Sequence, residues 1–131
     1  MANEVTPVEG PYEIHDMTVA NATAIVQYSI MELADPRTVT VNNGSGDVFG
    51  GIAMSEKAAS DGAVQMGCAF TGIFVMTAGV VAITAGQLVS TSGANLIKTA
   101  TEAEIAAGKA LGKALEDIAA SGTGEVKLLG F

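Results

Sequence analysis

The chain has 131 residues, 49% of them hydrophobic and only 15% charged, so it can bury the core of one domain and is too apolar to be disordered. Its formal net charge of −8 disfavours binding to the phosphate backbone of nucleic acids. The single cysteine, Cys68, excludes a disulfide within the chain, and its apolar neighbours predict a small buried hydrophobe.

We predict that residues 1–16 form an extended N-terminal arm with no core face of its own, because prolines and Gly10 alternate with acids and single apolar residues. Acidic residues are concentrated near this end, since residues 1–36 hold six Asp or Glu and no Lys or Arg. Such an arm is either a frayed terminus or a segment that lies on a neighbouring protein. In the second case its contact residues are Val5, Pro7, Val8, Tyr12 and Ile14.

Residues 17–131 are predicted to form a single β-rich domain. Short apolar or alternating segments are separated by turns rich in glycine and asparagine, which is typical of a small β-barrel or β-sandwich. Gly108 and Gly112 favour strand over helix in residues 109–119, since each glycine would cost about 1 kcal/mol inside a helix. The other predicted strands lie within residues 17–33, 37–41, 48–54, 64–76, 87–91, 96–100 and 125–129.

One short helix is predicted after residue 100. Thr101-Glu102-Ala103-Glu104 matches the capping box, in which the Thr hydroxyl accepts from the third backbone N–H and the Glu carboxylate reaches back to the cap. Gly108 is placed to end this helix after about two turns.

The stretch from residue 62 to 97 contains no charged side chain, and residues 66–86 are long enough to cross a bilayer. We favour strands here, because glycines interrupt the stretch and no Lys, Arg, Trp or Tyr flanks it as an anchor. Val64, Met66, Cys68 and Phe70 also alternate with small or polar residues, which is a strand pattern.

Catalytic and metal-binding patterns are weak. The only histidine, His15, lies in the predicted arm and is a poor partner for a nucleophile. One His and one Cys cannot supply a zinc ligand set, and the loop of residues 42–47 lacks the acids of an EF-hand calcium loop. We therefore expect no enzyme activity, no metal and no cofactor.

The second half carries a recognisable order of motifs. Ile83-x-x-Gly86-x-Leu88-Val89 is followed by the capped helix, then by Gly112-x-Ala114-Leu115-Glu116 and a terminal Val126-x-Leu128. Over residues 48–131 this order resembles the small capsid decoration (cement) proteins of tailed bacterial and archaeal viruses, and related prophage-encoded proteins.

The resemblance implies a β-tulip-like barrel that binds the outer surface of a viral capsid and stabilises it. It implies the major capsid protein as partner, a homotrimer, and N-terminal arms that add a strand to the capsid protein. Enzyme activity, cofactors, nucleic acid and membrane are not implied, and the protein would be made in the host cytoplasm and end on the virion. The alternative is a non-viral soluble β-barrel binding module or adhesin subunit.

Overall fold

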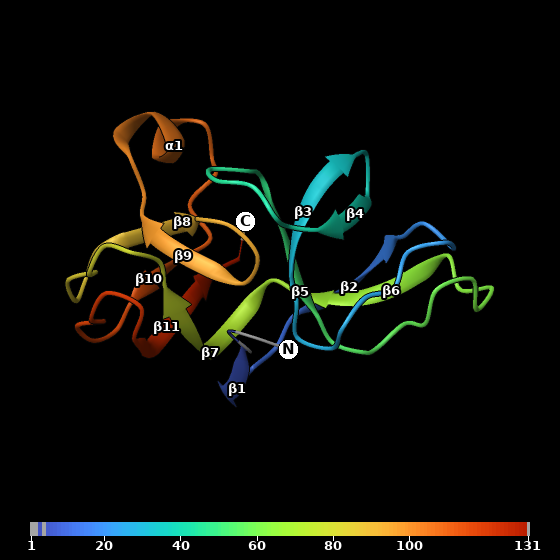
Figure 1. Ribbon diagram of the computed structural model, residues 1–131, viewed down its shortest axis with the longest axis horizontal. Helices are drawn as coiled ribbons and strands as arrows, with labels where there is room; N and C mark the ends of the chain where they lie inside the picture. The colour runs from blue at the N-terminus through green and yellow to red at the C-terminus, as the bar shows by residue number, and fades with distance from the viewer. Residues whose placement is uncertain (1–2, 4, 131) are drawn as a thin grey trace.

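The computed structural model describes Asn3 and residues 5–130, and the regular secondary structure of this part of the chain is eleven short strands and one short helix (Figure 1). The strands close into two small barrels that lie side by side, and the one helix sits beside the C-terminal barrel. The prediction of a mainly β, small-barrel fold with one short helix is therefore confirmed.

The N-terminal barrel closes in the strand order β2-β4-β3-β5-β6. All of its pairings are antiparallel except β2 with β4, which meet in parallel at Thr18 and Thr38. Its strands are β2 (Ile14–Thr18), β3 (Ile30–Asp35), β4 (Thr38–Val41), β5 (Phe49–Ala53) and β6 (Gln65–Ala69).

The C-terminal barrel is formed by the next five strands in the order β7-β11-β10-β8-β9, and a parallel pairing of β9 with β7 closes the ring. Helix α1 (Glu102–Ala106) connects β9 to β10, and β1 (Thr6–Glu9) lies on the outside of β7. The barrel strands are β7 (Thr71–Ala78), β8 (Leu88–Thr91), β9 (Leu96–Thr99), β10 (Gly112–Ala114) and β11 (Thr123–Leu129).

The two barrels have the same topology, strand for strand. In each, the first strand pairs in parallel with the third and antiparallel with the fifth, and the second strand lies between the third and the fourth. Isolated bridges recur at the same place, Ile25 with Lys57 and Ile83 with Ile118. Each bridge is followed by the tripeptide Ala-Ala-Ser, whose serine has a positive φ of 58° in both copies, Ser60 and Ser121. The fold is therefore an internal duplication of a five-stranded barrel.

The hydrophobic core runs across both barrels. The larger cluster includes Phe74 and Met76 of β7 together with Ile30 and Ile52 of the N-terminal barrel. A smaller cluster fills the N-terminal barrel around Met31 and belongs to that barrel alone. The shared cluster joins the two copies of the repeat into one packed body.

The predicted division into an arm of residues 1–16 and a domain of residues 17–131 differs from what the structure shows. The segment is extended, but β1 pairs with β7 and residues 14–16 are the first half of β2. The expectation that it lacks a core face is wrong, because Val5 is only 2% exposed and belongs to the larger core cluster. An extended chain end satisfies its backbone groups by pairing with β7 and gains the burial of Val5.

The uncharged stretch of residues 66–86 contributes most of β6, the whole of β7 and the following loop. In the described part of the chain, no helix has the length and apolarity needed to cross a membrane. The strand predicted over residues 64–76 is split at Phe70, where the chain passes from one barrel to the other.

The capping box is present as predicted. Thr101 Oγ1 accepts from the backbone N–H of Glu104, whose carboxylate accepts from the N–H of Thr101, and Gly108 follows the helix with a φ of +74°. Residues 112–114 form β10, which agrees with the strand prediction for the ambiguous segment. The predicted strand over residues 17–33 is broken by the loop that carries Ile25.

Candidate functional site

The five predicted arm residues fall into two groups. Val5 is buried, Pro7 lies opposite Phe74 in the β1–β7 pairing, and the Tyr12 ring packs 5.5 Å from the Phe74 ring. Val8 and Ile14 are 45% and 50% exposed and are the members of this set available to a partner.

Strand β1 is an edge strand that is protected against adding another strand. Pro7 has no backbone N–H to donate, and the pairing with β7 shifts register between Pro7 and Glu9. Proline, a bulge and a charge are common protections of sheet edges. A role in which this arm adds a strand to a partner therefore conflicts with its place in the fold.

A shallow hollow of about 280 Å³ opens beside β2. It is lined by Glu13, His15, Met17, Arg37, Phe70 and Gly130. His15 Nε2 lies 2.7 Å from Glu13 Oε1, and the His15 ring packs 5.9 Å from the Phe70 ring. Arg37 donates from Nη2 to the carbonyl of Asp16 at 2.7 Å. The His–Glu pair is exposed, and the side chains lining the hollow include no Ser, Thr or Cys nucleophile within the described residues. The arrangement is therefore an exposed polar surface.

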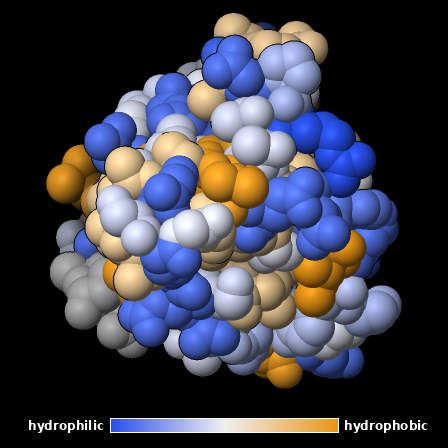
Figure 2. All heavy atoms as spheres, turned by 90° about the vertical axis from the view of Figure 1, so that its right-hand side faces the viewer, coloured by the Kyte–Doolittle hydropathy of each residue, from blue (hydrophilic) through white to orange (hydrophobic). Residues whose placement is uncertain are grey.

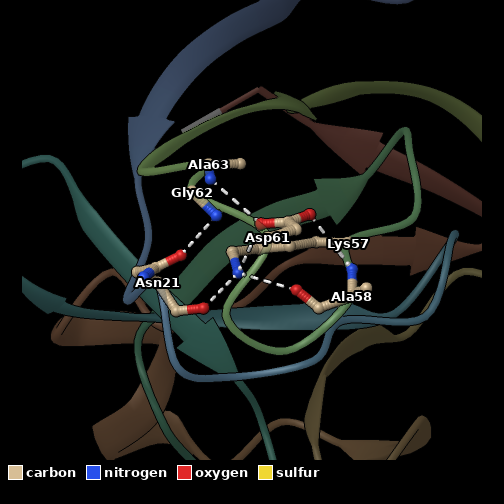
Figure 3. A network of polar contacts seen from close by, with 6 residues as sticks. All are labelled: Asn21, Lys57, Ala58, Asp61, Gly62 and Ala63. Atoms are coloured by element: carbon tan, nitrogen blue, oxygen red, sulfur yellow. Dashed lines mark hydrogen bonds and ion pairs between the residues drawn. The ribbon is translucent and has the colours of Figure 1, made fainter.

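The most deeply buried charge is Lys57, which stands where Ile118 stands in the other barrel (Figure 3). Its Nζ donates to the carbonyls of Asn21 at 2.5 Å and Ala58 at 3.1 Å, and lies 3.1 Å from Asp61 Oδ1. The backbone N–H of Ala63 and the Lys57 ammonium hold the pKa of Asp61 below its usual range. Every proton of the ammonium has an acceptor, so Lys57 closes this end of the barrel as a structural group.

Glu104 is a second structural hub. Beyond the capping box, its carboxylate accepts from Ser90 Oγ and pairs with Lys98 Nζ, both at 3.0 Å. Burial acts to raise the pKa of Glu104, but hydrogen bonds from the Thr101 N–H, Lys98 and Ser90 outweigh it and lower the pKa to about 2. These bonds tie α1 to β8 and β9 and occupy the carboxylate.

Cys68 is fully buried and has a free thiol, as predicted, and burial raises the pKa of that thiol to about 11. A neutral thiol out of reach of solvent is a poor nucleophile. Within the described residues, no group of three or more His, Cys, Asp or Glu side chains converges as a metal site. In the loop of residues 42–47, Asn42 donates from Nδ2 to the carbonyls of Gly44 and Gly93, and the backbone N–H of Asp47 donates to Thr91 Oγ1.

Exposed apolar side chains are dispersed over the surface. Figure 2 looks onto the end formed by the N-terminal barrel and shows hydrophobic patches separated by hydrophilic residues. The most exposed apolar residues are Val80 and Val81, 89% and 66% exposed, in the loop between β7 and β8. Val80 and Val81 are adjacent in the sequence, so their two exposed side chains are available together for contact with another protein.

A scan of the sequence against protein-family models gives no match, and a search of the curated proteins finds no significantly similar sequence. Neither comparison therefore supplies a function for this chain.

Proposed function

We propose that this protein is a structural virion component that decorates the outer surface of a tailed-virus capsid and stabilises the shell. Its partners are the major capsid protein and other copies of itself, with a homotrimer as the working unit. The observation that carries the proposal is the position in the fold of the motifs that resemble those of the capsid decoration proteins. Gly86-x-Leu88-Val89 leads into β8, Gly112-x-Ala114 is β10, and Val126-x-Leu128 lies in β11, three strands that are neighbours or near-neighbours in the C-terminal barrel.

The distribution of polar groups supports a structural role. Two charged groups that the fold shields, Lys57 and Glu104, are engaged by hydrogen bonds that stabilise loops and the helix. Exposed apolar side chains such as Val80 and Ile14 are available for contact with a partner. Such a body suits a protein that works by contact.

The arm contributes to this function in a different way from a free extension. The side chains of Val8 and Ile14 are exposed and can contact a partner, whereas the side chain of Val5 is buried in the core. Deleting residues 1–14 would remove Val5, all of β1 and the start of β2, so that truncation would test folding and binding together.

Single substitutions give a cleaner test. Purified protein is mixed with expanded, undecorated capsids, the shells are pelleted, and the bound protein is quantified. Val8→Ser, Ile14→Ser and Val80→Ser are compared with Ile105→Ser, a matched control on the exposed face of α1. The proposal expects saturable binding by the wild type, and weaker binding by at least one contact variant but not by the control. Absence of saturable binding by the folded wild type would contradict it.

The mass in solution is the companion measurement. Light scattering on a sizing column should give about three times the chain mass of 13.1 kDa. A trimer supports the proposal directly. A monomer that also fails to bind shells would favour the alternative, a soluble β-barrel binding module.

A further inference from the structure

The internal duplication allows each strand to be compared with its counterpart in the other barrel. Strands β2 and β7 are counterparts, since each opens its barrel, pairs with the last strand on one side and meets the third strand in parallel on the other. The outer edge of β7, the edge opposite the one that pairs with β11, is itself paired along most of its length. β9 pairs with it at Thr77 and Ala78, and β1 pairs with it at residues 73–75.

The matching edge of β2 is open. Within the described residues, β2 meets β4 only at Thr18, and no strand pairs with it on that side at residues 14–16. Residues 14–16 correspond to residues 73–75, the part of β7 on which β1 lies, because Thr18 and Thr77 occupy the same place in the parallel pairings. Among the described residues, the position that β1 fills in one barrel therefore has no occupant in the other.

The backbone groups of this edge point outward in a regular pattern. Glu13 accepts from the N–H of Phe70, and Val19 donates to Val64, so odd-numbered residues of this strand face β6. Thr18 donates to the carbonyl of Arg37 on the opposite side, which places the even-numbered residues on the outer edge. Ile14 and Asp16 thus present their peptide groups there, and the Ile14 side chain is half exposed beside them.

We propose that the outer edge of β2 at residues 14–16 binds an extended, cationic segment of a partner protein, which adds to the sheet as β1 adds to β7. Backbone hydrogen bonds to Ile14 and Asp16 would supply the pairing, and the exposed Ile14 side chain would contact the segment's apolar side chains. The inference does not depend on the proposed function, since any protein with such a segment could be the partner.

Charge selects the occupant. Asp16 lies in β2, Glu13 immediately precedes this strand, and Asp35 belongs to the adjoining hairpin. Arg37 is the only Lys or Arg among residues 13–18 and 35–38. The chain's own arm carries Glu9 and no Lys or Arg, so the arm of a second copy would be repelled. Pairing of β2 with β2 of a second copy would bring both sets of carboxylates together, which is unfavourable for the same reason. A segment with Lys or Arg complements the edge.

In the absence of a partner, the Arg37 side chain occupies part of this edge. Its guanidinium donates to the carbonyl of Asp16, the acceptor that an added strand would need. The equivalent hairpin position in the other barrel is Asn95, which also has a positive φ and whose Oδ1 accepts from the N–H of Ile30. Arg37→Asn therefore removes the competing donor and keeps a residue suited to the left-handed conformation.

The test uses the full chain and a fluorescent peptide of about ten residues that alternates valine or threonine with lysine, as strand addition requires. A peptide with glutamate in place of lysine is the charge control. Asp16→Pro removes the outward N–H without touching the β2–β6 ladder, and Asp16→Ala is its control because it loses the carboxylate and keeps the N–H. Anisotropy measures affinity, and amide NMR of the wild type maps the site.

We expect the lysine peptide to bind and the glutamate peptide to bind at least about tenfold more weakly, with shifts centred on the Ile14 and Asp16 amides. Asp16→Pro should bind up to about tenfold more weakly than Asp16→Ala, the effect of one hydrogen bond. Arg37→Asn should bind several-fold more tightly. Equal affinity of the Pro and Ala variants, no binding of the lysine peptide, or wild-type shifts elsewhere would overturn the proposal. Self-association through β2 would also overturn it, because the occupant would then be a second copy.

Discussion

Replacing Lys57 tests most directly how the N-terminal barrel accommodates a buried charge where the C-terminal barrel has Ile118. Lys57→Met keeps a long apolar side chain and removes the ammonium that bonds Asn21, Ala58 and Asp61. Hydrogen bonds to a charged group contribute about 1.5–3 kcal/mol each, but removing the ammonium also removes its desolvation cost of several kcal/mol. The Asn21 carbonyl keeps the Ser60 N–H as a partner, and Ala58 is exposed to water.

The net expectation is a loss of about 2 kcal/mol in the free energy of unfolding for Lys57→Met, or about 8 °C in Tm for a chain of this length. Lys57→Ala should lose about 4 kcal/mol, because the aliphatic stem of Lys57 is buried as well. The reverse change, Ile118→Lys, should lose more than about 4 kcal/mol, since Gly122 stands where Asp61 stands and offers no carboxylate.

Urea unfolding followed by circular dichroism gives all three free energies, with Tm from calorimetry as a check. The informative result is the order of the losses in the free energy of unfolding, which should be smallest for Lys57→Met, larger for Lys57→Ala and largest for Ile118→Lys. A Lys57→Met protein as stable as the wild type would refute the reasoning, because the ammonium would then contribute nothing beyond its stem. Tolerance of Ile118→Lys would refute the view that the Asn21–Asp61 surroundings are what permit a buried charge.

Three other predictions follow from the same contacts. Val5→Ala should lower the free energy of unfolding by about 1.5–3 kcal/mol and Val8→Ala by less than about 0.5, and equal losses in urea titrations would contradict the burial of the arm. Because the pKa of Glu104 falls from 4.5 to about 2 on folding, its contribution to stability is complete above pH 4.5 and is lost as the pH falls toward 2. Glu104→Gln should therefore flatten the acid limb of the stability–pH curve, and an unchanged limb would contradict this. Cys68, with a pKa of about 11, should react with a thiol reagent at pH 8 far more slowly than in urea, and similar rates would contradict its burial.

Local patterns were sufficient to predict the fold class and several elements. The alternation in residues 37–41, the turn composition of residues 42–47 and the capping box at Thr101 each depend on near neighbours in sequence. The glycines and the alternation in residues 66–86 favour strands over a long apolar helix, and the structure divides this stretch between β6, β7 and a loop.

Features that depend on distant partners were not predictable in this way. Val5 is buried because Thr6 pairs with Val75, a partner that no local pattern identifies. Lys57 lies between two predicted strands, and only the approach of the Asn21 loop provides acceptors for its ammonium. The open edge of β2 is apparent only by comparison with β7.

The duplication itself left a faint signal in the sequence. The repeated Ala-Ala-Ser and the paired Ile25 and Ile83 are its clearest traces. The spacing between matching residues varies along the chain, and the N-terminal copy has a loop where the C-terminal copy has α1. Core positions changed residue type as well, with Lys57 opposite Ile118, so the repeat survives in topology better than in sequence.

Shell stability tests the central claim most directly. Expanded capsids are heated with and without saturating protein, and loss of intact shells is followed by light scattering or by exposure of their interior to a dye. The account predicts a higher shell melting temperature with the wild type, saturation at a fixed number of copies per shell, and no gain with an unrelated protein of similar charge. Shells that melt at the same temperature with and without this protein would contradict it.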